Sequence, residues 1–136
     1  MNRVFADTSA LVALKDSGDE HHAKALEFFE HLLNGARTQL ILTNYIACEV
    51  HAYFCRTPGV ALEYLDALRT HPLFVVVRAG PRDEKKALDI LRSSSDKTYS
   101  FADAVSFAVM ERLLLKSAFA FDRHFRQRGT CAVLPP

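Results

Sequence analysis

The chain has no tryptophan and only three cysteines, five glycines and five prolines among its 136 residues. The cysteines are odd in number and lack the spacing of a disulfide framework, which predicts a reducing, cytosolic compartment. No run approaches the roughly 20 apolar residues of a membrane span, and no apolar signal-peptide segment follows Met1. We therefore expect a cytoplasmic protein that does not enter a membrane.

Several enzyme motifs are also missing. The sequence has no P-loop, no GxGxxG, no GxSxG and no HExxH pattern, which argues against nucleotide cofactors, serine-hydrolase chemistry and zinc-protease chemistry. The first predicted strand ends in Asp7-Thr8-Ser9. This tripeptide lacks both the acidic pair of a phosphoaspartate receiver and the D-x-D pair of a phosphatase with an aspartate nucleophile.

What the chain does have is a globular composition, with 49% hydrophobic and 24% charged residues. It shows no repeat and no linker, so we expect one domain covering residues 1–136. The net charge of +1 is unevenly spread: residues 1–111 carry 12 basic and 15 acidic side chains, and residues 112–136 carry five basic and one acidic. A basic end would suit a polyanionic ligand, although a solvated basic helix and loop would look the same.

Strand-like and helix-like segments alternate along the sequence. Short apolar runs at residues 3–7, 39–43, 73–78, 118–121 and 131–134 predict strands. Helical periodicity covers residues 8–15, about 25–34, 44–56, 60–69, 81–93 and 101–115. Right-handed crossovers between such strands build a parallel sheet covered on both faces. The prediction is an α/β fold, a three-layer α/β/α domain with a mostly parallel sheet of four to five strands.

Four acidic residues stand near the junctions of these segments. Asp7 and Asp122 close apolar strands, and Glu49 and Asp103 lie near the starts of helices. The carboxyl ends of parallel strands share one edge of the sheet, so these side chains are expected to gather in one crevice. Crowded carboxylates repel one another, and a divalent cation relieves that repulsion. The pattern therefore predicts a magnesium or manganese site and hydrolytic phosphate chemistry.

Each acid also has a simpler explanation. Asp7 could be a helix N-cap, Ser100-x-x-Asp103 resembles a capping box, and Asp122 could end a strand at a turn. Glu49 is flanked by apolar residues one turn inside a helix, where a buried charge would need a partner. Capping and metal binding are compatible, so both interpretations stay open.

Further residues are candidates by position. Ser9 and Ser106 could orient carboxylates or water, and Asp96 could be an auxiliary acid. Basic residues after Asp122 could hold phosphates: Arg123, His124, Arg126 and Arg128.

A rival site on residues 44–56 would bind zinc. Cys48, His51 and Cys55 fall on one helical face, but no fourth ligand is near in sequence.

Four segments together resemble a known family. VFADTSALVAL, TNYIACEV, YSFADAVSFAVM and AFAFDRHFRQRG occur in this order and span essentially the whole chain. They resemble the PIN-domain ribonucleases, and more narrowly the VapC-type toxins of toxin–antitoxin pairs. The resemblance implies a metal-dependent endoribonuclease whose catalytic, metal-binding acids are Asp7, Glu49, Asp103 and Asp122. Ser9 matches the family's small polar residue, and Asp96 matches an acid found in many members.

The resemblance also implies a cofactor and partners. The cofactor would be Mg²⁺ or Mn²⁺. As a separate hypothesis about mechanism, we expect Asp7 and Asp103 to hold it, Glu49 to ligate it or position water, and Asp122 to complete the set. RNA would be the substrate, a small DNA-binding antitoxin would block the cleft, and the chain would form a homodimer. Two alternatives remain: a non-catalytic binding or scaffold protein of this fold, or a DNA-directed nuclease.

Overall fold

Strands and helices alternate along the chain in a computed structural model that describes all 136 residues. Its elements are β1 (Asn2–Ala6), α1 (Thr8–Lys15), α2 (His22–Asn34), β2 (Thr38–Thr43), α3 (Asn44–Phe54), α4 (Pro58–Thr70), β3 (Phe74–Val77), α5 (Pro81–Ser93), α6 (Phe101–Arg112), β4 (Ser117–Phe119), α7 (Arg123–Arg128) and β5 (Ala132–Leu134).

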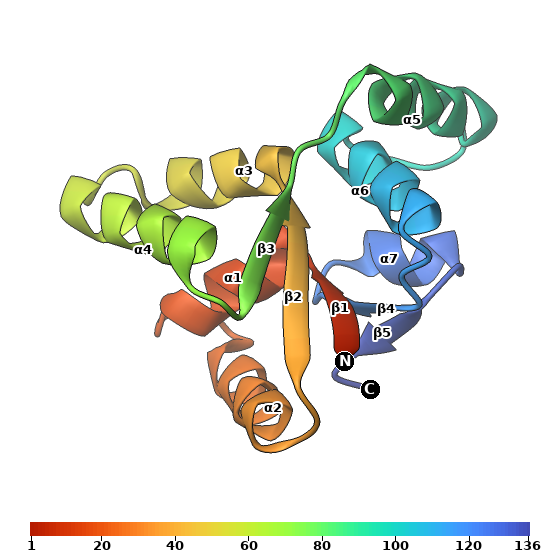
Figure 1. Ribbon diagram of the computed structural model, residues 1–136. Coiled ribbons are helices and arrows are strands. Elements are labelled where there is room, and N and C mark those ends of the chain that lie inside the picture. Colours follow the sequence, from red (N-terminus) through yellow and green to blue (C-terminus); the bar gives the residue numbers. More distant parts are fainter.

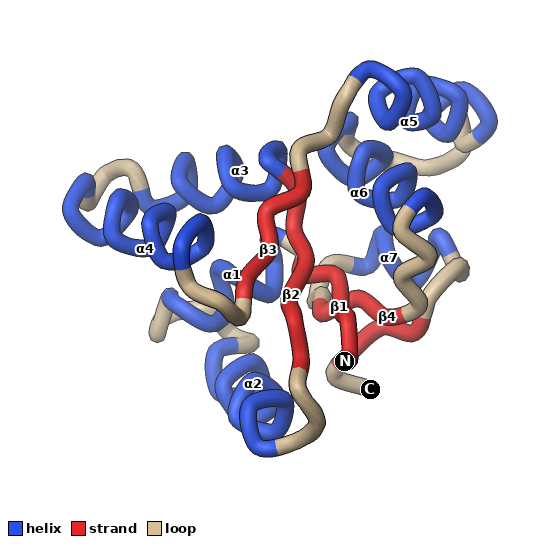
Figure 2. Tube along the Cα trace, in the orientation of Figure 1, coloured by secondary structure: helices blue, strands red, loops and turns tan.

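The five strands form one sheet in the order β3-β2-β1-β4-β5, and every neighbouring pair is parallel. Helices α1 to α4 lie on one side of this sheet in Figure 1, and α5 to α7 lie on the other. The tube in Figure 2 shows the strands enclosed between these two groups of helices. The predicted three-layer α/β/α architecture is confirmed, and the sheet is parallel throughout.

The central strands are buried because helices cover both faces. Val4, Phe5 and Ala6 of β1 have no exposed surface. The Phe5 ring stacks on Phe125 at a centroid distance of 6.0 Å, which fastens α7 to the sheet. Helix α6 is buried continuously from Ala104 to Met110, in agreement with its almost uninterrupted apolar sequence.

Most predicted elements are shifted by one to three residues at their ends, and two helices differ more clearly from the prediction. Helix α6 ends at Arg112 rather than at residue 115, because Leu114 adopts a left-handed conformation with φ of 57°. Helix α7 was not predicted as an element, since its six residues bury only Phe125 and give no periodicity. Only the residues at its two ends indicate this helix in the sequence: Asp122 caps the first turn, and Gly129 ends the last turn with φ of 69°.

Helices α5 and α6 are joined by a carboxylate–guanidinium pair. Asp83 is 6% exposed, and both of its oxygens accept hydrogen bonds from Arg112, at 2.7 and 2.9 Å. These bonds hold the pKa of Asp83 below its ordinary value of 3.8. A depressed pKa adds stability that is present above about pH 4 and is lost as the pH falls further.

Replacing Arg112 with methionine is expected to lower the free energy of unfolding by about 2 kcal/mol at pH 7. This decrease is smaller than for a fully buried pair, because water reaches Arg112. The difference from the wild type should shrink below pH 4, as measured by urea unfolding at several pH values. Arg92→Met is the control, since its pair with Asp89 is exposed and should contribute about 0.5 kcal/mol or less. Equal decreases in the two variants would contradict this interpretation.

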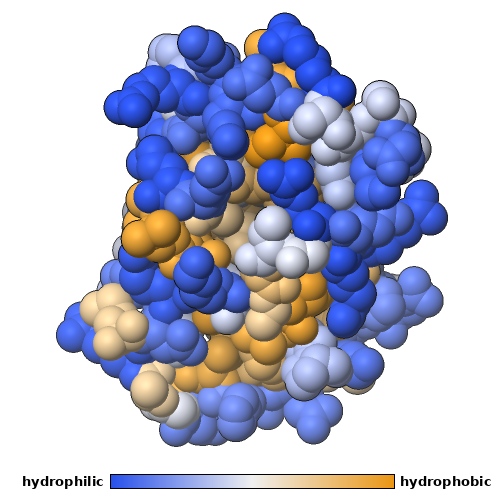
Figure 3. Space-filling view, turned by 90° about the vertical axis from the view of Figure 1, so that its right-hand side faces the viewer, coloured by the Kyte–Doolittle hydropathy of each residue, from blue (hydrophilic) through white to orange (hydrophobic).

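The outer face of α5, α6 and α7 is largely hydrophilic. Figure 3 shows this face, with apolar side chains reaching the surface in a patch at mid-height and below. Three large apolar residues of these elements are exposed: Leu88 on α5, Phe101 at the start of α6 and Leu114 after α6. None of the helices combines the length and the hydrophobicity needed to cross a bilayer.

Candidate functional site

Three of the four acidic residues also take part in helix capping. Asp7 is the N-cap of α1 and accepts a hydrogen bond from the Ser9 amide at 3.1 Å. Asp122 is the N-cap of α7, and Asp103 forms a capping box with Ser100 at the start of α6. Each cap uses one carboxylate oxygen and leaves the second oxygen available. The capping roles are therefore real, and they do not prevent binding of a cation.

The four acids line one pocket at the carboxyl edge of the sheet, with a volume of about 460 Å³. Asp7 and Asp122 precede α1 and α7, and Glu49 and Asp103 lie on α3 and α6, so the four are up to 115 positions apart in the sequence. We call this hollow the acidic pocket, and its 13 lining residues are Asp7, Thr8, Ser9, Val12, Asp19, His21, Glu49, Tyr53, Ser100, Asp103, Phe121, Asp122 and His124.

Asp7 is the most deeply placed of the acids, with 5% of its surface exposed. Burial raises the pKa of Asp7 from 3.8 to about 7; the Ser9 hydrogen bonds oppose this shift, and the charges of Asp103 and Asp122 add to it. No basic side chain forms an ion pair with Asp7. A buried carboxylate that faces two others without a basic partner is a position that a cation would stabilise.

The Ser9 hydroxyl connects the ends of β1 and β4. It donates to Asp7 Oδ2 at 2.6 Å and accepts from the backbone amides of Phe121 at 2.9 Å and Asp122 at 3.1 Å. One side chain thus fixes the orientation of Asp7 and the path of the segment that carries Asp122. The sequence marked Ser9 as an orienting hydroxyl but did not indicate its contacts 112 and 113 residues away.

The exposure of Glu49 differs from the prediction, which treated it as a buried charge in need of a partner. It is exposed rather than buried, because it occupies the side of α3 that faces the acidic pocket and not the core. Its Oε1 accepts a hydrogen bond from the Thr8 hydroxyl at 2.7 Å. Thr8 therefore orients Glu49, a role for which the sequence favoured other hydroxyls.

His124 lies between two of the acids. Its Nδ1 is 2.7 Å from Asp103 Oδ2 and 3.2 Å from Asp122 Oδ1, and its side chain is only 15% exposed. The Thr98 hydroxyl is 3.3 Å from its Nε2. The sequence suggested that His124 holds a phosphate beside the site, whereas the structure places the ring inside the acidic pocket.

The other predicted site residues do not line this pocket. Asp96 is exposed and paired with Lys97 at 2.8 Å. The Ser106 hydroxyl is buried and donates to Ala102 O in its own helix. Arg128 lies over the Phe107 ring at 5.6 Å, at the opposite end of α7 from Asp122. Arg123 and Arg126 are exposed on α7, next to the pocket in sequence.

Two aromatic side chains at the rim were not anticipated. The His21 ring stacks on Phe121 at a centroid distance of 4.5 Å and an interplanar angle of 4°. Tyr53 donates from its hydroxyl to Asp16 Oδ2 at 2.7 Å and so ties α3 to the end of α1. Both contacts join distant segments, and no local pattern in the sequence signals them.

The donor chemistry of the acidic pocket fits magnesium or manganese, which prefer hard oxygen ligands. One oxygen of each acid has no hydrogen-bond partner in the protein. As the side chains are placed, however, no three or more His, Cys, Asp or Glu lie close enough to share one ion. Gathering the acids on a cation therefore requires rotation of their side chains. The residues of the rival zinc site, Cys48, His51 and Cys55, are likewise not placed close enough to share one ion. Cys48 and Cys55 are exposed free thiols.

Comparison with known proteins identifies the family. The PIN domain family matches residues 4–130. The 23S rRNA-specific endonuclease VapC20 of Mycobacterium tuberculosis is 30% identical over 97% of this chain and 98% of its own length. A VapC ribonuclease of Archaeoglobus fulgidus is 25% identical over 88% of this chain and 76% of its own.

Solved structures agree with this match. The crystal structure of M. tuberculosis VapC20, described as a Sarcin-Ricin loop cleaving toxin, has a TM-score of 0.83 at 28% identity and covers 93% of this chain and 95% of that one. FitAcB of Neisseria gonorrhoeae has a TM-score of 0.70 at 14% identity over 96% of this chain and 95% of its own, which shows a shared fold. With a family match over most of its residues and a relative aligned along nearly its whole length, this chain belongs to the PIN domain family.

Proposed function

We propose that this chain is a VapC-type endoribonuclease that hydrolyses RNA phosphodiester bonds with the help of Mg²⁺ or Mn²⁺, and that it is the toxin of a toxin–antitoxin pair. The observation that carries the proposal is the acidic pocket, which is lined by four carboxylates from four separate segments of the chain. The relationship to VapC20 supports the reaction class.

Within this proposal the acids have distinct roles. Asp7 and Asp103 hold the cation, Glu49 ligates it or positions the attacking water, and Asp122 completes the set. When bound, the cation activates water and neutralises charge that develops on the phosphate. Ser9 keeps Asp7 in place through its 2.6 Å hydrogen bond, and Thr8 does the same for Glu49.

Binding of the RNA strand needs cations outside the pocket, because the acids repel phosphates. Arg123 and Arg126 are exposed on α7 next to Asp122, and they are the natural candidates on this side of the pocket. Of the other two residues in the predicted basic set, His124 lies inside the pocket beside Asp103 and Arg128 lies over the Phe107 ring, so neither is assigned to the strand. VapC20 acts on 23S rRNA, so ribosomal RNA is the first substrate to test.

The proposal extends to partners. A small DNA-binding antitoxin is expected to cover the acidic pocket, as the VapC-type relationship implies, and a second copy of the chain is expected to form a homodimer. The three free cysteines support a reducing, cytoplasmic setting.

Metal removal is the direct test. The purified protein, incubated with 23S rRNA fragments, is expected to cleave in Mn²⁺ or Mg²⁺ and to become inactive in excess EDTA, with recovery when Mn²⁺ is restored. Products should carry a 5′-phosphate and a 3′-hydroxyl, as read by end-labelling and mass spectrometry.

Each part of this experiment has a result that would contradict the proposed function. Cleavage that persists in EDTA, or products with a 2′,3′-cyclic phosphate, would remove the metal mechanism. A single-stranded DNA of the same sequence serves as the control substrate. Faster cleavage of the DNA would favour a DNA-directed nuclease, and binding of RNA without cleavage would favour a scaffold protein.

A further inference from the structure

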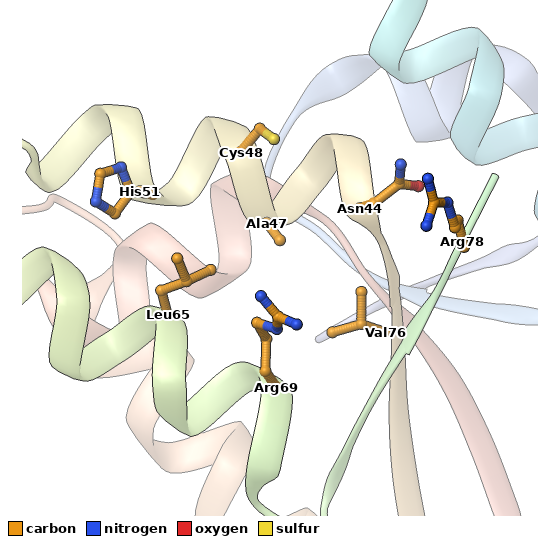
Figure 4. Close-up of a pocket in the computed structure, with 8 residues that line it drawn as sticks. All are labelled: Asn44, Ala47, Cys48, His51, Leu65, Arg69, Val76 and Arg78. Carbon is orange, nitrogen blue, oxygen red and sulfur yellow. The ribbon is translucent and has the colours of Figure 1, made fainter.

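A second pocket lies on the opposite side of α3 from the acids. It has a volume of about 680 Å³ and is enclosed by α3, α4 and the end of β3 (Figure 4). Ala47, Leu65 and Val76 give it an apolar wall. Arg69 and Arg78 supply two guanidinium groups, and we call the hollow the arginine pocket.

The two arginines have no partner within the protein. Neither makes an ion pair, in contrast to Arg92 and Arg112. In Figure 4 the Arg69 side chain projects from α4 toward α3, and the Arg78 side chain lies beside Asn44 at the start of α3. No carboxylate lines the pocket, and His51 adds a third basic group. Such a set is suited to an anion, since guanidinium groups bind phosphate through paired hydrogen bonds.

The position of the arginine pocket links it to the acidic one. Arg78 follows β3, Asn44 follows β2 and Asp7 follows β1, and these strands are neighbours in the sheet. Strands lie about 4.8 Å apart, so the ends of β3 and β1 are roughly 10 Å apart along this edge. On α3, Glu49 and Tyr53 face the acidic pocket, whereas Ala47 and His51 face the arginine pocket.

We propose that the arginine pocket binds a backbone phosphate of the RNA strand a few nucleotides from the cleaved bond, an inference that rests on the proposed nuclease function. The acidic pocket itself repels the strand, so the attraction must come from its flanks. Arg123 and Arg126 provide one flank beyond β4, and Arg69 and Arg78 provide the other beyond β2. An RNA strand would then cross the carboxyl edge of the sheet, with its scissile bond over the acids.

The test measures binding separately from cleavage. A fluorescein-labelled single-stranded RNA is titrated in EDTA, by anisotropy, against the wild type, Arg69→Ala, Arg78→Ala and the double variant. Each single change is expected to weaken binding about tenfold, the effect of one charge-assisted hydrogen bond. The slope of log K against log salt should decrease by about 0.7 for each phosphate that the variant no longer binds. Arg37→Ala is the matched control, because Arg37 is an exposed arginine that does not line the arginine pocket, and it should leave affinity and slope unchanged.

Further arms separate the possible failures. Arg69→Lys and Arg78→Lys keep the charge and should keep the slope. An unchanged affinity and slope in the double variant, with thermal unfolding like the wild type, would overturn the proposal. The proposal would also be overturned if the double variant bound a glutamate-rich peptide more weakly than the wild type does but bound RNA normally. That result would identify the pocket as a docking site for a protein. If no preparation cleaves RNA while the arginine-dependent slope persists, the nuclease function fails and the phosphate site stands.

Discussion

Replacing Asp7 with asparagine is expected to abolish RNA cleavage and, at the same time, to stabilise the metal-free protein at pH 8. Asparagine retains an oxygen that can accept the Ser9 hydrogen bonds, but it lacks the charge that holds a cation. Removal of several kcal/mol of transition-state stabilisation lowers the rate by about three orders of magnitude. Cleavage is measured on a labelled RNA in saturating Mn²⁺.

The gain in stability follows from the pKa of Asp7. Burial raises this pKa from 3.8 to about 7, so the folded protein keeps a proton that the unfolded chain releases between about pH 4 and pH 7. Because the folded state binds more protons in this window, its stability falls as the pH rises. Because asparagine does not ionise, the stability of the variant does not fall with pH in this way. One pKa unit corresponds to about 1.4 kcal/mol, and relaxation of the pocket offsets part of the effect, so a gain of about 2 kcal/mol is expected at pH 8.

Urea unfolding in EDTA at pH 4 and pH 8 measures this effect, with little difference expected at pH 4. Mn²⁺ should then raise the melting temperature of the wild type but not of the variant, since only a folded state that binds the ion gains from it. Asp89→Asn, an exposed substitution on α5, is the control for both measurements. A variant that cleaves RNA normally, or that is less stable at pH 8 than the wild type, would show that Asp7 is only a helix cap.

Removal of the Ser9 hydroxyl is expected to have the second largest effect. Ser9→Ala deletes one hydrogen bond to Asp7 and leaves the amides of Phe121 and Asp122 without their acceptor. Unpartnered amides cost about 2 kcal/mol of stability. A displacement of Asp122 relative to Asp7 by about 1 Å is enough to lower the cleavage rate about 100-fold.

The cleavage assay for Ser9→Ala is run well below the melting temperature of the variant, so that unfolding does not account for the lower rate. Ser93→Ala is the matched control, since its hydroxyl donates only to Ile90 O in its own helix, and it should retain normal activity. A Ser9→Ala protein with wild-type activity would mean that Asp122 holds its position without the hydroxyl, or that Asp122 is not needed.

The parts of the fold that repeat a simple pattern could be predicted from the sequence. Buried strands such as Leu40–Leu42 read as apolar runs, and the helices between them read as periodic segments, so the parallel sheet followed. The gathering of Asp7 and Asp122 at one edge depends only on their positions after β1 and β4. Helix α7 was missed because six residues with one buried side chain give no period.

The details that depend on tertiary contacts could not be predicted. Glu49 sits among apolar residues in sequence, yet its own face of α3 is open to water, and the orientation of a helix about its axis is decided by packing. The contact between His124 and Asp103 joins residues 21 positions apart, and the contact between Thr8 and Glu49 joins residues 41 positions apart. The arginine pocket is a similar case, since Arg69 and Arg78 look like ordinary surface cations until α4 and β3 are placed.

Asp7, Asp103 and Asp122 each commit one oxygen to the first turn of a helix. The partial positive charge of a helix start offsets part of the repulsion among them, so the chain can complete its folding before any ion arrives. Under the proposed mechanism, folding of the chain and binding of the cation would then be separate events. The metal-free protein would already hold Asp7, Asp103 and Asp122 at the pocket, and the cation would only have to bind there.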